Sequence, residues 1–248
     1  MICPKCRYEQ DDQNIECVRC GIVFAKFLAA RQSNPRENRR GSIDEAPKEK
    51  RSGISMADLF FYTHPENNIL LISGRGAVLI VLIIWGFKFM VSPLEENYAG
   101  ASFMHLVNLP FHEAGHIFFR FLGSFLAALG GTLGQFLMPL VCLAVFLLKT
   151  RDPFGAAVAL WWLGQNFFDI APYINDARSL SLPLLGGNTG HSSPYGFHDW
   201  EYLLTESGLL PYDHVLAKLC VFAGAIIFFI SFAWGAILLH KQYKTLSP

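Results

Sequence analysis

Long apolar stretches dominate the part of the chain that follows Leu70. Four of them stand out, with approximate bounds 77–91, 121–148, 154–168 and 219–239. The second contains 28 residues without a charge, and the fourth contains 21. A helix needs about 20 apolar residues to cross a bilayer. The pattern therefore predicts four membrane-spanning helices.

The stretch 101–120 is apolar but interrupted by polar residues, so it allows two interpretations. It is either a fifth span or a helix that enters the bilayer partway and turns back. Lys and Arg prefer the cytoplasmic side of a membrane. Four spans with a cytoplasmic N-terminus place Lys149, Arg151 and the basic C-terminal tail inside and the Glu95–Glu96 loop outside. We expect an all-α polytopic membrane protein with four spans and a partly embedded helix at 101–120, and five spans as the alternative.

Composition supports a bilayer environment. The 248 residues are 52% hydrophobic and 16% charged, whereas soluble domains average roughly 25% charged residues. No apolar signal segment follows Met1, so we expect a cytoplasmic N-terminus and a location in a bacterial inner membrane. The formal net charge is zero, and we expect membrane lipid rather than nucleic acid as a partner.

Four cysteines near the N-terminus have the spacing of a metal site. Cys3, Cys6, Cys17 and Cys20 form the pattern C-x2-C-x10-C-x2-C. Each C-x2-C pair can point two thiolates at one ion, and two pairs complete a tetrahedral zinc site. The alternative, two disulfides, requires an oxidising compartment that does not suit a cytoplasmic N-terminus. The spacing predicts a structural zinc ion.

These patterns divide the chain into three parts. Residues 1–30 form the expected zinc ribbon. Residues 31–68 form a polar, basic stretch that we interpret as a flexible linker and juxtamembrane segment. Residues 69–248 form the expected transmembrane domain.

The segment 112–116 has the sequence His-Glu-Ala-Gly-His. On a helix, the four-residue spacing places His112 and His116 on one face, where both imidazoles can hold one zinc ion. Glu113 projects beside that face and can take a proton from a water molecule on the metal. This motif predicts a catalytic zinc centre with Glu113 as general base.

The polar residues before the motif indicate where its helix begins. The side chain of Asn108 can cap a helix N-terminus, and Pro110 is tolerated in a first helical turn. We therefore expect the helix to begin near Asn108.

A catalytic zinc site usually has three protein ligands, so one more is required. The candidates are Asp176, which we prefer, with His198 and Asp169 as alternatives. His198 lies in a second polar cluster, His-Asp-Trp-Glu at 198–201. Each candidate also has a structural interpretation: a cap or salt-bridge residue for Asp176, an ordinary loop residue for His198, and a satisfied polar group in a bundle for Asp169.

The HExxH motif in an apolar setting, followed by an Asp-bearing segment, resembles the site-2 protease group of intramembrane metallopeptidases. In that family the Asp lies in a motif of the form Asn-x-x-Pro…Asp-Gly and supplies the third zinc ligand. The nearest equivalent here is Asn166…Pro172…Asp176, with Ala177 in place of the Gly and a different spacing of the Pro. The resemblance covers roughly residues 100–178 and implies that Asp176 binds the metal.

The leading hypothesis is a zinc metalloprotease that hydrolyses peptide bonds of a membrane or membrane-proximal protein. The alternative is a non-proteolytic membrane subunit or assembly factor whose metal site is structural. The ribbon would then be a docking module for a cytosolic protein, a role that it could also have in the protease. A metal transporter is a third possibility, but it requires acidic groups spread through several spans.

Overall fold

The computed structural model describes residues 1–27, 55–63 and 68–246, which fall into two compact units, Met1–Gly53 and Ile54–Pro248. Most of the predicted linker, at 28–54 and 64–67, lies outside the described residues. Its described part contains a short helix, α2 (Met56–Phe61), which is capped by the side chain of Ser55.

The first unit consists of two similar turns that each carry a cysteine pair. The amide of Cys3 donates to the carbonyl of Tyr8 over 2.9 Å, and the amide of Cys17 donates to the carbonyl of Ile22 over 2.9 Å. The residue after each pair has a left-handed backbone, with φ of 57° at Arg7 and 69° at Gly21. The two turns therefore repeat one geometry fourteen residues apart, as the repeated C-x2-C pattern predicts.

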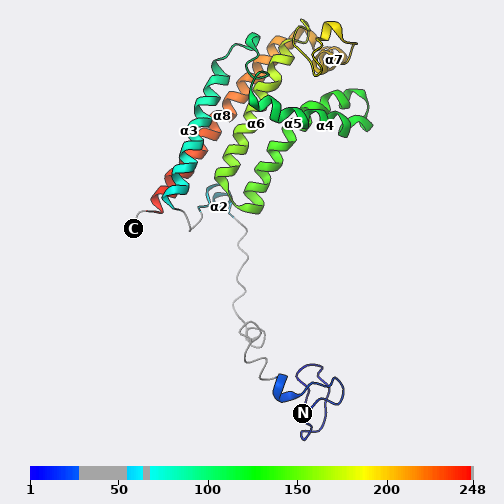
Figure 1. The fold of residues 1–248 in the computed structure, drawn as a ribbon, viewed down its shortest axis with the longest axis vertical. Coiled ribbons are helices and arrows are strands. Elements are labelled where there is room, and N and C mark those ends of the chain that lie inside the picture. The colour runs from blue at the N-terminus through cyan, green and yellow to red at the C-terminus, as the bar shows by residue number, and fades with distance from the viewer. Residues whose placement is uncertain (28–54, 64–67, 247–248) are drawn as a thin grey trace. The chain divides into compact units, whose positions relative to one another are not determined.

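Three long helices form the body of the second unit. α3 (Ile69–Val91), α6 (Pro153–Asn175) and α8 (Asp213–Lys244) lie side by side (Figure 1). Gly164 and Gly224 bring α6 and α8 close together, because a Cβ added at Gly224 would lie 2.9 Å from the Gly164 carbonyl oxygen. Small residues permit such close helix contacts in membrane proteins.

One end of the bundle is held by basic residues. Arg75 of α3 pairs with Asp152 over 3.1 Å, and Lys241 of α8 lies 4.6 Å from the ring centre of Phe61 in α2. The start of α3, the loop before α6 and the end of α8 therefore share this end. The positive charges used to predict the cytoplasmic side are gathered here, since Lys149 lies just before the same loop.

The opposite end contains the acidic loop and the irregular segments. It includes η2 (Leu94–Glu96) and α7 (Asp199–Glu206), and Arg178 pairs with Asp213 over 2.7 Å where α6 ends and α8 begins (Figure 1). The end of α6, the start of α8 and the whole of α7 therefore lie away from the basic end.

Within the described residues, three helices are long and apolar enough to cross a membrane: Ile69–Val91, Ser124–Thr150 and Leu210–Lys244. The structure thus supports a membrane protein with three candidate spans, fewer than the four or five that the apolar pattern predicts. The predicted span at 154–168 belongs to α6, which is as long as α3 but is not among the three. Most of α6 is buried against its neighbours, so its sequence is less uniformly apolar than that of a lipid-exposed helix.

The HExxH motif lies on a helical hairpin that crosses the bundle. α4 (Phe103–Phe119) turns through η3 (Arg120–Leu122) into α5 (Ser124–Val145), which a π-helical turn extends to Thr150. Figure 1 shows α4 and the first part of α5 side by side, crosswise to α3, α6 and α8. Gly115 on α4 faces Gly130 on α5 with no room for a Cβ on either residue.

α4 begins earlier than the sequence suggested. Its first residue is Phe103, and the side chain of Ser102 caps it by accepting from the amide of His105. Asn108, which we expected at the cap, lies inside the helix and is fully buried, and Pro110 is likewise in the helix interior. The apolar residues before Asn108 favour continuing the helix, and Asn108 finds its partners on α6.

Candidate metal centre

The two histidines of the motif present the same ring nitrogen to one point. The Nδ1 atom of His112 lies 2.8 Å from the side-chain oxygen of Gln135, and the Nδ1 atom of His116 lies 2.8 Å from the carbonyl oxygen of Ala127. Both partners are acceptors, so each Nδ1 carries the proton. Each Nε2 then has a free lone pair, which is the form of histidine that binds a metal.

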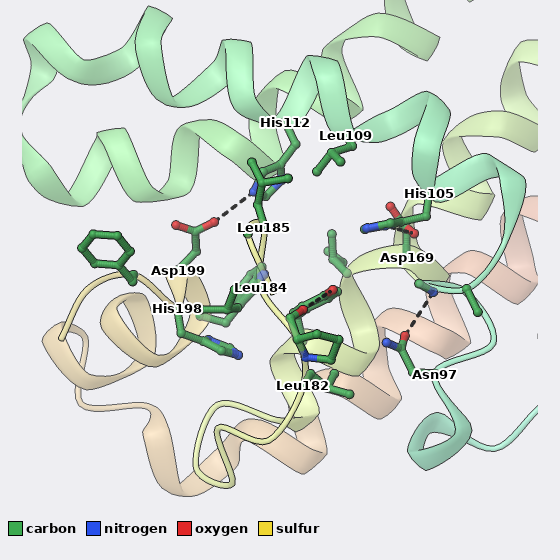
Figure 2. Close-up of a pocket in the computed structure, with 18 of the residues that line it drawn as sticks. Asn97, His105, Leu109, His112, Asp169, Leu182, Leu184, Leu185, His198 and Asp199 are labelled. Atoms are coloured by element: carbon green, nitrogen blue, oxygen red, sulfur yellow. Dashed lines mark hydrogen bonds and ion pairs between the residues drawn. The ribbon is translucent and has the colours of Figure 1, made fainter. Parts of the chain in front are cut away.

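Asp199 completes this group. Its Oδ2 atom lies 3.0 Å from Nε2 of His112 and 3.2 Å from Nε2 of His116. Figure 2 shows His112 and Asp199 facing each other across the end of a cavity. Burial alone would raise the pKa of the Asp199 carboxyl, but hydrogen bonds from His112 and His116, when their Nε2 atoms are protonated, lower that pKa below its usual range.

Two imidazole lone pairs and one carboxylate oxygen thus converge on one another. Three acceptors cannot satisfy each other, so the group requires either protonated rings or a cation between them. Two nitrogens and one oxygen are a donor set that suits zinc, and a catalytic zinc site has three such ligands. The residues therefore fit a zinc ion.

Gly131 on α5 leaves the space that this arrangement needs. A Cβ at this position would lie 2.6 Å from Nε2 of His112 and 2.6 Å from Nε2 of His116. Both rings therefore lie directly against the backbone of α5, and any larger residue would displace them.

Glu113 lies beside the metal-ligand group. One of its carboxylate oxygens is within 4.8 Å of one ring nitrogen of each histidine. The side chain is half-buried and lines the cavity, and within the described residues it has no hydrogen bond or ion pair. An unpaired carboxylate at this position can accept a proton from a water molecule in the cavity.

Asp176 is engaged elsewhere. It ends α6, and its Oδ1 atom accepts hydrogen bonds from the side chains of Ser179 and Ser181, while Oδ2 accepts from the amide of Leu182 over 2.9 Å. Burial alone would raise the pKa of Asp176, but these hydrogen bonds lower it below the usual range. The structure does not bring Asp176 to the motif histidines, and its contacts give it the cap role that was its structural interpretation.

His198 and Asp169 also have defined partners. His198 is buried, its Nδ1 atom caps α7 by accepting from the amide of Glu201, and its Nε2 atom lies 3.5 Å from Oδ2 of Asp176. Asp169 accepts from Asn108 over 3.0 Å and lies 3.0 Å from Nδ1 of His105. Neither residue contacts the Nε2 atoms of the motif, although both line the same cavity.

The sequence analysis included Asp199 in the cluster at 198–201 but selected its neighbour His198. The sequence does mark Asp199 in one way: it is an acidic residue directly after His198, which caps a helix. A carboxylate is favourable at a helix N-terminus. That signal indicates a helix start, and only the packing of α7 against α5 shows which side chain reaches the motif.

Two cavities meet at the metal-ligand group. The first has a volume of about 870 Å³ and is lined by His112, Glu113 and Asp199, and farther away by Glu95 and Glu96. The second, of about 540 Å³, is lined by residues that include His116, Asp199, Arg120 and Tyr195. The convergent acceptors therefore have open space on both sides.

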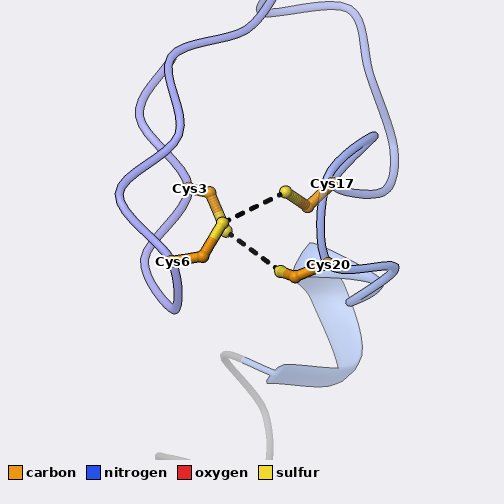
Figure 3. A group of neighbouring side chains, drawn as sticks. All are labelled: Cys3, Cys6, Cys17 and Cys20. Atoms are coloured by element: carbon orange, nitrogen blue, oxygen red, sulfur yellow. Dashed lines mark hydrogen bonds between the residues drawn. The ribbon is translucent and has the colours of Figure 1, made fainter.

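The cysteines of the first unit form the second candidate metal site. The Sγ atoms of Cys3 and Cys20 lie 3.7 Å apart, and those of Cys6 and Cys17 lie 3.6 Å apart (Figure 3). All four cysteines are free thiols, and their sulfurs lie within 4.8 Å of one another. This is the arrangement of a tetrahedral four-cysteine site and not of two disulfides.

Comparison with protein-family models, with curated proteins and with solved structures finds no match to this chain.

Proposed function

We propose that this protein is a membrane-embedded zinc metalloprotease with His112, His116 and Asp199 as metal ligands and Glu113 as general base. The observation that carries the proposal is the convergence of two Nε2 lone pairs and one carboxylate oxygen beside an unpaired glutamate. Asp199 takes the ligand role that the sequence had suggested for Asp176. The four-cysteine ribbon holds a second, structural zinc ion.

Bound zinc would supply Lewis acidity toward a peptide carbonyl and toward a water molecule. Glu113 accepts the proton of the attacking water and returns it to the leaving amine. Gln135 and Ala127 hold the ring protons of the two histidines on Nδ1, and Asp199 supplies the negative charge that favours a cation.

The two cavities favour a catalytic zinc site over a structural one. Structural zinc sites are closed by four protein ligands, whereas catalytic sites keep a position open. Here the ligand group has three members and borders open space toward both His112 and His116. Space on both sides suits an extended peptide that continues past the cleaved bond, and so an endopeptidase.

The proposed substrate is a membrane or membrane-proximal protein. The two histidines lie on a hairpin with exposed apolar residues at its tip, among them Ile117 and Phe121, and such a surface suits contact with lipid. We place the basic end of the bundle and the N-terminus in the cytoplasm of a bacterial inner membrane, with α6 as a fourth span that packs inside the other three. The catalytic end then faces the outer side, and the ribbon is free to bind a cytosolic protein.

Comparison of cells that express the wild-type protein or Glu113→Gln tests the proposal. New protein N-termini can be mapped by mass spectrometry in both, with zinc content measured on the purified proteins. The wild type should generate N-termini in or near membrane segments that Glu113→Gln does not generate, at equal zinc content. Identical sets of N-termini at full zinc occupancy would contradict the protease assignment and favour a non-proteolytic membrane subunit.

A further inference from the structure

A chain of buried polar residues extends from His112 into the interior of the bundle. Gln135 of α5 and Asp169 of α6 are each only 3% exposed. The side-chain oxygen of Gln135 lies 2.8 Å from Nδ1 of His112, and its nitrogen lies 3.5 Å from Oδ2 of Asp169. Buried polar groups cost free energy unless they are paired, so this connection between three helices requires an explanation.

The two motif histidines are oriented by different means. The partner of His116 is the main-chain carbonyl of Ala127, which α5 fixes regardless of the side chain at that position. The partner of His112 is a side chain that can itself rotate. Gln135 can hold His112 only if its own amide is held, and Asp169 is the acceptor that holds the amide nitrogen.

Asp169 is in turn fixed by α4. Its Oδ1 atom lies 3.0 Å from Nδ1 of His105, and its Oδ2 atom accepts from Asn108 over 3.0 Å. Asn108 also donates to Gln165 over 2.8 Å and accepts from the indole nitrogen of Trp162 over 2.8 Å, so it has three hydrogen bonds to α6. Asp169 therefore cannot turn away from Gln135 without losing two other contacts.

From these contacts we propose that Gln135, held by Asp169, is a positioning residue that keeps the Nε2 lone pair of His112 directed at the metal. The inference rests on the proposed metal site. Without an acceptor at Nδ1, the ring of His112 is free to carry its proton on Nε2 or to rotate, and both changes remove the lone pair from the site. Partners of this kind typically change metal affinity by roughly 10–100-fold.

The test measures zinc affinity rather than proteolysis. Each variant is built on Cys3→Ser/Cys6→Ser, which removes the ribbon site, and zinc is titrated against a chelator of known affinity at pH 7.5. Gln135→Met keeps the length of the side chain but removes the acceptor, and it should weaken zinc binding by roughly 10–100-fold. Gln135→Glu restores an acceptor and should bind within a few-fold of the wild type, because its carboxyl group can share a proton with Asp169.

Gln242→Met is the matched control. Gln242 of α8 is as buried as Gln135, and within the described residues its side chain has no hydrogen bond to a motif histidine, to Asp169 or to Asn108. It should leave zinc affinity unchanged. Equal losses in Gln135→Met and Gln242→Met would overturn the inference, since they would indicate general damage to packing.

His112→Ala separates this inference from the proposed function. If His112→Ala loses zinc while Gln135→Met binds as tightly as the wild type, the positioning role is wrong and the metal site stands. If His112→Ala itself retains full zinc affinity, the proposed metal centre is wrong and the positioning role fails with it.

Discussion

Substitution of Gly131 by alanine perturbs the metal centre without changing any ligand. The added Cβ would lie 2.6 Å from Nε2 of both His112 and His116, whereas ordinary contacts begin near 3.4 Å. The two rings would have to retreat by about 0.8 Å, several times the ~0.2 Å by which metal–ligand distances normally vary. Alanine is also the better helix former, so α5 itself should not be weakened. The damage should therefore fall on the metal and not on the fold.

The assay is zinc content and thermal unfolding of detergent-purified protein. Gly131→Ala should lose the zinc ion of the membrane unit and keep the one in the ribbon. Gly74→Ala is the control, because a Cβ at Gly74 meets nothing within 4 Å, and it should keep both ions. Full zinc content and unchanged affinity in Gly131→Ala would refute the placement of both Nε2 atoms against α5.

Three further predictions concern the ribbon, the topology and Asp176. Cys3→Ser combined with Cys6→Ser should remove one of two zinc ions per chain, and metal analysis that finds no loss would contradict the ribbon site. A cysteine placed at Ser192 should react with a membrane-impermeant thiol reagent on intact cells, whereas one placed at Thr245 should not; the reverse pattern would invert the proposed topology. The pKa of Asp176 is lowered in the folded protein, so its contribution to stability is present above about pH 4 and is lost as pH falls through the folded-state pKa. Asp176→Asn should therefore lower the unfolding temperature at pH 7, with a difference that shrinks below about pH 4, and an equal difference at every pH would exclude this role.

Both metal-ligand patterns could be predicted because their spacing is local. Two C-x2-C pairs need only a tight turn each, and His112 and His116 need only one helical turn. The structure brings together both sets of atoms that these spacings predict. Local geometry does not depend on how distant segments pack, so the sequence is sufficient for this part of the site.

The choice of Asp199 as the proposed third ligand could not be made from the sequence, because it depends on long-range packing. Asp176 and Asp199 both lie at helix ends near the motif, and the sequence offers no measure of which one reaches it. The choice depends on how the loop after α6 folds, and that fold is fixed by hydrogen bonds to Asp176 itself. Asp176, the ligand that the sequence favours, organises the loop after α6 and contacts His198, next to Asp199.

The sequence predicts the long apolar helices but not how they pack, because packing again depends on contacts between distant segments. The four apolar runs fall in α3, α5, α6 and α8, and within the described residues α3, α5 and α8 are long and apolar enough to cross a membrane. α6 lies among them and carries polar residues such as Gln165 and Asp169 toward its neighbours, so its hydropathy is a poor guide to its place. The crosswise hairpin of α4 and α5 depends on the glycines that allow these helices to touch. The positions of these glycines do not follow the spacing of apolar residues, so the hydrophobic pattern does not reveal them.

The central claim is that His112, His116 and Asp199 hold a metal ion, and one comparison tests it most directly. Zinc content is measured for Asp199→Ala and Asp176→Ala, both in the Cys3→Ser/Cys6→Ser background, where only the membrane unit can bind zinc. The account predicts that Asp199→Ala loses the ion and that Asp176→Ala keeps it. Retention in Asp199→Ala together with loss in Asp176→Ala would contradict the ligand set and the mechanism built on it.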